Sequence, residues 1–263
     1  MSTEQESEGT EMPFLDHLEE LRWRIVKMLL ALIVAFMVSM TVSMNVDVIW
    51  WIVHPILPYL HGQKLIVTHP MEKFTILLQI AGGLGVVMAS PVIAYQIWAF
   101  LAPALMPKER RVIIPVLVGA AFLFLVGVAT SVFVFVPITM GLVEGIQTEA
   151  VQSLISLSEY VGFLFSISLA FGVMFEVPIL ILLLTALGLV TPKLLAKYRR
   201  HAFVIGLIAC EIITPGDLII STLILFVPVY GLYELSILLS WMIFRRRLKN
   251  ERAAEENAAG ASA

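Results

Sequence analysis

Long apolar runs alternate with short polar stretches along the chain, and most of these runs are long enough to cross a bilayer. About 20 apolar residues in a helix cover the hydrocarbon core. The first runs of this length lie at roughly 25–44, 74–100, 112–136 and 160–189. We predict a transmembrane helix for each run, the third bounded by Pro137 and the fourth interrupted at Glu176 and Pro178.

The end of the chain divides less simply, because its first apolar run is short. A helix over residues 201–213 would rise only about 20 Å, less than the roughly 30 Å of the hydrocarbon core. The helix-breaking sequence TPGD follows at 214–217, and residues 218–244 form a long apolar run. We predict a short span 5, a tight turn and span 6, and a re-entrant arrangement is the alternative.

The basic residues indicate how these spans are oriented. Of the 17 Lys and Arg residues, all but Lys64 and Lys73 fall in four short stretches, near 22–27, 108–111, 193–200 and 245–252. Each interval between basic stretches has room for two bilayer crossings. Since Lys and Arg favour cytoplasmic loops, the pattern predicts six spans with both termini in the cytoplasm.

Composition supports a membrane protein and excludes a water-soluble globule. The 263 residues are 59% hydrophobic and 14% charged, and the mean hydropathy is +0.94. The sequence therefore predicts an all-α polytopic membrane protein. We expect a disordered cytoplasmic lead-in over residues 1–12, a membrane domain over 13–244, and a basic, then low-complexity cytoplasmic tail over 245–263.

Two further features suggest how the spans pack. Gly82, Gly83 and Gly85 lie in the second apolar run and offer a surface where another helix can approach closely. The connection from Asn45 to Lys73 carries Trp50, Trp51, Pro55, Pro58 and Tyr59 among aliphatic residues. Because Trp and Tyr prefer the membrane interface, we expect this segment to cap the helices at the outer surface.

No motif for catalysis or for binding a metal or cofactor occurs in the sequence. The five histidines contain no pair four residues apart, Cys210 is the single cysteine, and no GxSxG or phosphate-binding glycine loop is present. An intramembrane enzyme would need a nucleophile with a base at usable spacing. We therefore expect no enzyme, no cofactor and no metal site.

Carboxyl groups inside the apolar runs are the first candidates for function. An ionised carboxylate near the midplane costs about 2.5–3.5 kcal/mol even on the lenient insertion scale, so Glu176 should face protein or water, or be neutral. Pro178 bends the helix beside it. Glu234, Glu211 and Asp217 carry less weight, and Glu234 could equally sit in a helix contact.

A proton- or ion-coupled transporter using Glu176, Glu234 and Asp217 is the alternative function, although we find no internal repeat to support it.

A second set of charges lies at the predicted cytoplasmic face, in Glu19, Glu20 and Arg22 before span 1 and in Glu109 before span 3. The simpler interpretation is that the acids favour the helix dipole and the bases anchor lipid head groups. The functional interpretation is that two carboxylates from different helices face one groove. Such a groove would bind a pair of arginines through charge-assisted hydrogen bonds.

Five motifs together resemble one known family. In chain order they are FLDHLEELR at 14–22, SPVIAYQIWAFLAPAL at 90–105, KERR at 108–111, FGVMFEVP at 171–178 and TPGD at 214–217. In order and spacing they are similar to TatC, the receptor subunit of the twin-arginine protein translocase. The resemblance covers residues from about Pro13 to Phe244.

This resemblance implies a glove-shaped bundle of six helices with short spans 5 and 6, in the inner membrane of a prokaryote. The implied partners are twin-arginine signal peptides of folded cargo, single-span proteins of the TatA and TatB type, further copies of the chain and the lipid bilayer, but no nucleic acid. Transport would use the proton-motive force. The implied sites are signal-peptide binding at Glu20, Arg22, Phe100 and Glu109, a concave-face carboxylate at Glu176, and outer-loop and partner-docking positions at Pro55, Thr214 and Asp217.

Two positions depart from the family pattern. Ser221 stands where a glutamine is common, one helical turn after the aspartate of the last hairpin. Glu211 lies where an apolar residue would be expected. Ser221 weakens the expectation of one particular polar contact with a partner helix.

Overall fold

The computed structural model describes residues 8–60, 62–101, 113–144, 154–186, 188–213 and 219–261. These residues are almost entirely helical, with one isolated β-bridge between Ile66 and Ser156. Within these ranges, five helical segments are long and apolar enough to cross a membrane. The chain is therefore an all-α polytopic membrane protein, as predicted. It divides into two compact units.

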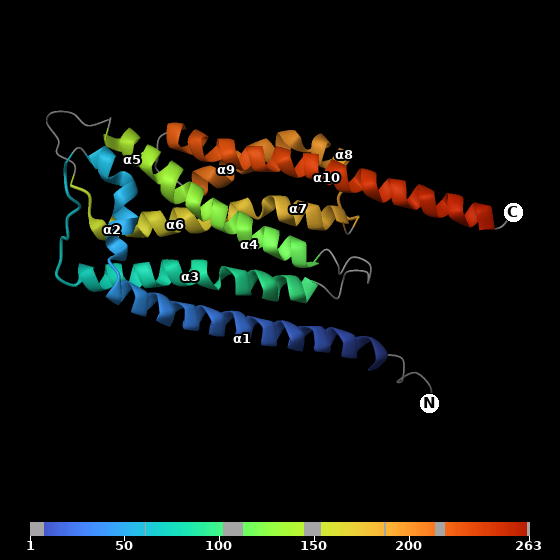
Figure 1. Cartoon of the computed structure of the whole chain (residues 1–263), viewed down its shortest axis with the longest axis horizontal. Coiled ribbons are helices and arrows are strands. Elements are labelled where there is room, and N and C mark those ends of the chain that lie inside the picture. The colour runs from blue at the N-terminus through green and yellow to red at the C-terminus, as the bar shows by residue number, and fades with distance from the viewer. Residues whose placement is uncertain are drawn as a thin grey trace. The chain divides into compact units, whose positions relative to one another are not determined.

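Unit 1 comprises the described residues of Met1–His54, Lys64–Ala121 and Leu154–Phe165. Its main elements are α1 (Glu8–Asn45) and α3 (Glu72–Leu101), which lie side by side (Figure 1). Their candidate spans, Asp16–Asn45 and Glu72–Phe100, match the first two predicted spans. Helix α1 begins at Glu8, inside the predicted lead-in, and the division of the chain at residues 12 and 244 stays a prediction.

Glycines allow close helix contacts in unit 1. A Cβ atom on Gly85 would lie 3.1 Å from Cα of Phe36 in α1, and one on Gly83 would overlap the ring of Phe165 in α6 (Leu157–Phe175). Gly82 has open space around it. The predicted close-approach surface is thus confirmed for Gly83 and Gly85, while for Gly82 it stays a prediction.

The connection between α1 and α3 is built from short elements. Helix α2 (Val48–Val53) begins after Asp47, whose carboxylate accepts a hydrogen bond from the Trp50 amide at 3.1 Å. The hydroxyl of Tyr160 in α6 donates to the carbonyl of Ile52 at 2.8 Å. A 3₁₀ helix, η1 (His54–Leu60), follows α2 and contains Pro55 and Pro58.

Unit 2 comprises the described residues of Pro55–Gln63, Phe122–Ser153 and Ser166–Ala263. Here the predicted end of span 3 at Pro137 was wrong, because α4 (Ile113–Thr130) continues through the π-helical turn η4 (Ser131–Phe135) into α5 (Val136–Glu144). The Val136 amide donates to the Ser131 carbonyl, five residues back. This shift in hydrogen bonding just before Pro137 accommodates the proline inside the helix, which continues to Glu144.

The fourth span is broken where the sequence predicted. Helix α6 ends at Phe175, and α7 (Val177–Ala186) begins two residues later. Glu176 lies at the break, and buried Pro178 follows in the first turn of α7. A Cβ atom on Gly127 would lie 2.7 Å from the Phe171 carbonyl oxygen, so α4 and α6 also pack closely within unit 2.

The last helices correct one expectation. Helix α8 (Pro192–Lys197) leads into α9 (Arg199–Ile213), which has 15 residues and is short, as predicted. Helix α10 (Ile219–Ala261) has 43 residues and contains a candidate span of 24 residues, Thr222–Arg245. Span 6 is therefore not short. The helix continues beyond Arg245 because the tail is rich in Ala, Glu, Lys and Arg, which favour helices.

Candidate functional site

The candidate site in unit 1 is built around an ion pair on α1. Glu20 and Arg24 are four residues apart, so both side chains lie on one face of the helix. Nε of Arg24 donates to Oε1 of Glu20 at 3.0 Å, and Nη2 donates to the same oxygen. The Glu20 side chain is 35% exposed and that of Arg24 18% exposed. Glu20 therefore already binds a guanidinium group where solvent can reach its carboxylate.

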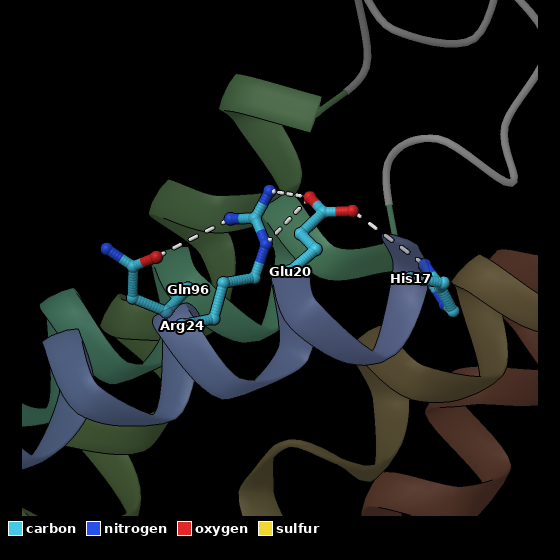
Figure 2. Close-up of polar contacts among 4 residues, drawn as sticks. All are labelled: His17, Glu20, Arg24 and Gln96. Carbon is cyan, nitrogen blue, oxygen red and sulfur yellow. Dashed lines mark hydrogen bonds and ion pairs between the residues drawn. The ribbon is translucent and has the colours of Figure 1, made fainter. Parts of the chain in front are cut away.

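A glutamine from the neighbouring helix extends this pair. Nη1 of Arg24 donates to Oε1 of Gln96 in α3 at 3.5 Å, at the outer limit of a hydrogen bond. Figure 2 shows Arg24 lying between Gln96 and Glu20, so that one guanidinium spans two acceptors from different helices.

An aromatic pair lies on the other side of the carboxylate. Nδ1 of His17 is 3.7 Å from Oε2 of Glu20, too far for a hydrogen bond (Figure 2). The His17 ring stacks on Phe100 with centroids 4.4 Å apart and an angle of 16° between the planes. Among the described residues nothing donates a hydrogen bond to Oε2. Oε1 of Glu20 thus accepts from Arg24, while Oε2 has only the longer contact with His17 and can accept from a further donor.

The structure brings some of the predicted signal-peptide residues together. Glu20 and Phe100 meet through His17, which contacts both. Arg22 lies on α1 with an exposed side chain. Glu109 falls outside the described residues, as do Thr214 and Asp217, so the expected meeting of Glu20 and Glu109 stays a prediction.

The remaining predicted positions lie apart from this site in sequence. Glu176 is half-buried at the break between α6 and α7, and its carboxylate makes no hydrogen bond or ion pair with the described residues. Its amide donates to the Val173 carbonyl at 3.1 Å and its carbonyl accepts from Leu180 at 3.0 Å. Pro55 is half-buried in η1.

Two other acidic residues of unit 2 have partners that favour a structural role. Oε2 of Glu234 is 2.8 Å from Nη2 of Arg199, and Oε1 accepts from the Tyr230 hydroxyl at 3.1 Å. Glu211 accepts from the hydroxyl of Thr222 at 2.9 Å. Each carboxylate links α9 to α10, so the helix-contact interpretation of Glu234 is the better one.

Sequence reasoning missed Glu72, the first residue of α3, which is only 8% exposed. Its carboxylate accepts from the amide and hydroxyl of Thr68, the amide of His69, the hydroxyl of Ser156 at 2.6 Å and the amide of Ser158 at 3.3 Å. Ser156 is 84 residues away in sequence, and no spacing pattern signals such a contact. Arg24 could have been found from its four-residue spacing to Glu20, but Gln96 could not.

The described residues contain no group of three or more His, Cys, Asp or Glu side chains that could hold a metal ion. What the Glu20 site offers is a half-exposed carboxylate beside an aromatic pair. A group of this kind binds guanidinium and ammonium ions, and guanidinium best, because its planar donors match a carboxylate.

Comparison with known proteins agrees with the motif pattern. The family model described as "Sec-independent protein translocase protein (TatC)" matches residues 16–228. The translocase protein TatCy of Bacillus subtilis is 33% identical over 260 residues, covering 95% of this chain and 97% of the relative. TatC of Escherichia coli is 34% identical over 229 residues, covering 87% and 88%.

A solved structure is similar throughout. The crystal structure described as the twin arginine translocase receptor TatC in DDM superposes with a TM-score of 0.76 at 32% identity. The alignment covers 85% of this chain and 99% of that one.

Proposed function

Since this chain belongs to the TatC family of Sec-independent protein translocase proteins, we propose that it is the subunit that binds twin-arginine signal peptides of folded cargo proteins. That the chain is a multi-pass membrane component of the translocase follows from the family and from its apolar helices.

The observation that carries the proposal is the engagement of Glu20 with a guanidinium group. Arg24 donates two hydrogen bonds to Oε1, while Oε2 accepts no hydrogen bond from the described residues and lies 3.7 Å from Nδ1 of His17. A signal peptide with two adjacent arginines presents the same donor group. The fit is chemical, because a carboxylate beside flat aromatic rings favours arginine over lysine through planar hydrogen bonding and stacking.

Electrostatics supports one location for the site. The exposed Arg22 and Lys27 lie on α1 near Glu20, in the first of the four basic stretches. With basic stretches on the cytoplasmic side, Glu20 faces the compartment in which cargo folds. Glu109, in the second basic stretch, supplies the carboxylate for the second arginine, and Arg22 and Phe100 border the site.

Later steps are part of the same proposal. Glu176 sits half-buried at a helix break, where a polar group with no partner among the described residues can wet the membrane interior. Pro55, Thr214 and Asp217 contribute to the outer surface on which single-span TatA- or TatB-type partners and further copies dock. The proton-motive force drives transport.

The test is site-specific cross-linking of a twin-arginine precursor to the full-length protein in native membranes. We expect Glu20→Gln combined with Glu109→Gln to lower cross-linking roughly tenfold or more, because the ligand loses two charge-assisted acceptors. Glu159→Gln is the matched control, since Glu159 is exposed in the first turn of α6, away from both residues in sequence.

A second precursor, in which two lysines replace the arginine pair, separates charge from geometry. Its cross-linking to the unaltered protein should be weak, and the double variant should reduce it little further. Undiminished capture of the twin-arginine precursor by the double variant would remove Glu20 and Glu109 from the site.

A further inference from the structure

The Glu20 carboxylate is not vacant, and this shapes what a ligand must do. Arg24 approaches it with Nε and Nη2, and both groups donate to Oε1 (Figure 2). A planar guanidinium usually pairs with a carboxylate through two parallel bonds, one to each oxygen. The Arg24 pair uses one oxygen only, so it is not the strongest geometry the two groups can form.

Resting on the signal-peptide function above, we propose that Arg24 is a resident competitor for Glu20, which an arginine of the signal must displace in order to bind. Both groups are guanidinium ions, and Glu20 cannot pair through both of its oxygens with an incoming arginine while Arg24 holds Oε1. Ligand binding is therefore an exchange of one arginine for another.

The exchange is energetically feasible because the resident pair is weak. It joins residues four apart on one helix, and Glu20 is 35% exposed. Pairs of this type contribute little to stability. An incoming arginine that bonds to both oxygens forms the stronger arrangement and brings the rest of its peptide with it.

Gln96 supplies the place to which Arg24 moves. Its Oε1 is already 3.5 Å from Nη1 of Arg24. Arg24 is only 18% exposed, so its guanidinium needs an acceptor when Glu20 is lost. A small shift toward α3 shortens the Gln96 contact and keeps the displaced charge hydrogen-bonded.

The test measures the affinity of a fluorescent twin-arginine signal peptide for the purified full-length protein. Arg24→Gln removes the competitor while keeping a polar side chain of similar reach. We expect the dissociation constant to fall about two- to fivefold, the range that corresponds to a weak ion pair between residues four apart on a helix. A peptide with alanines in place of the arginine pair should gain nothing.

A control variant separates the effect of net positive charge on affinity from competition between Arg24 and the ligand. Lys27→Gln removes one positive charge from an exposed position on the same helix and should change the affinity by less than half as much as Arg24→Gln. If the two variants tighten binding equally, long-range repulsion explains the effect and the competitor role is wrong. Gel filtration of each variant checks that the protein is folded.

Gln96→Leu provides an independent test. It should weaken binding about twofold in the unaltered protein, because displaced Arg24 loses a hydrogen-bond acceptor. In the Arg24→Gln background it should have no effect. An equal loss in both backgrounds would show that Gln96 contacts the ligand directly and does not receive Arg24.

Glu20→Gln distinguishes failure of this inference from failure of the function. If Glu20→Gln binds the peptide normally, the proposed signal-peptide site and the competition both fall. If Glu20→Gln loses binding while Arg24→Gln binds unchanged or more weakly, only the competition falls. Combined with Glu20→Gln, Arg24→Gln should change nothing further.

Discussion

Unit 1 contains two carboxylates with opposite surroundings, Glu72 at the first turn of α3 and Glu20 near the other end of the α1–α3 pair. Glu72 is 8% exposed and is held by neutral amide and hydroxyl donors from two short segments, 68–69 and 156–158. Glu20 is 35% exposed and is held by one cation from its own helix. Both are acidic and both are hydrogen-bonded, so neither property identifies a binding site.

The difference lies in whether the partners can be exchanged. The donors to Glu72 are backbone amides and short hydroxyl groups, which cannot move away without unfolding the local chain. The partner of Glu20 is a long side chain that can turn toward a second acceptor, Gln96, without moving the backbone. A fully hydrogen-bonded buried carboxylate holds the fold, whereas a half-exposed carboxylate with one mobile cation suits a binding site.

The largest effect should come from removing the buried carboxylate, Glu72. In Glu72→Ala the donors on Thr68, His69, Ser156 and Ser158 lose their acceptor, and the bridge between Ile66 and Ser156 should open. Local opening exposes the connection to protease. We expect trypsin to cleave after Lys64 and Lys73 roughly tenfold or more faster than in the unaltered protein.

Those two lysines suit the assay, because both are exposed and no other Lys or Arg lies between residues 28 and 107. Glu159→Ala is the matched control, since Glu159 is exposed in the neighbouring first turn of α6. Unchanged cleavage in Glu72→Ala would mean that the connection is held by the bridge and by Tyr160, and that the contrast with Glu20 is wrong.

A smaller effect is expected from the glycine contact between the helices. In Gly85→Val the new Cβ atom would lie 3.1 Å from Cα of Phe36, so α1 and α3 must separate slightly. Overpacking of this kind costs about 1–3 kcal/mol of unfolding free energy. Gly82→Val is the control, because nothing lies within 4 Å of a Cβ atom there, while the change in helix propensity is the same.

Gly85→Val also tests whether the surroundings of Glu20 and Glu72 are independent of each other. The Arg24–Gln96 contact joins α1 to α3 and should be lost as these helices part. The bonds of Glu72 involve α3, its preceding turn and the start of α6, so trypsin protection should persist. Loss of protection together with altered peptide binding would show that the two ends are not independent.

Features that depend on residues close together in the chain could be predicted from the sequence, whereas features that depend on distant segments could not. The spans were readable because bilayer crossing depends on apolar residues that are contiguous in the chain. The break at Glu176 and Pro178 was also readable, since Pro acts on its own helix. The prediction that span 3 ends at Pro137 was wrong because the π-helical turn at 131–135 allows the helix to continue through the proline. No local sequence pattern predicts such a turn.

The two carboxylates show the same limit. Glu20 was predicted from its motif, and its pairing with Arg24 follows the helical repeat. Glu72 was missed because its partners are set by the meeting of the segments around 66–72 and 156–158. A contact between distant segments depends on tertiary packing, which the hydropathy pattern does not contain.

The smallest effect should come from Glu20→Gln on stability, and this is the most direct check of the comparison. The variant loses a partly exposed ion pair between residues four apart on one helix, so the loss should be slight. We expect the rate of trypsin cleavage to stay within about twofold of that of the unaltered protein and the midpoint of thermal unfolding to change little. The affinity for a twin-arginine peptide should fall strongly. A glutamine oxygen can still accept from Arg24, which preserves the local structure.

If Glu20→Gln destabilised the protein as much as Glu72→Ala, both carboxylates would be structural, and the loss of binding would say nothing about a ligand site. Stability kept with binding lost is the one result that a purely structural Glu20 cannot produce.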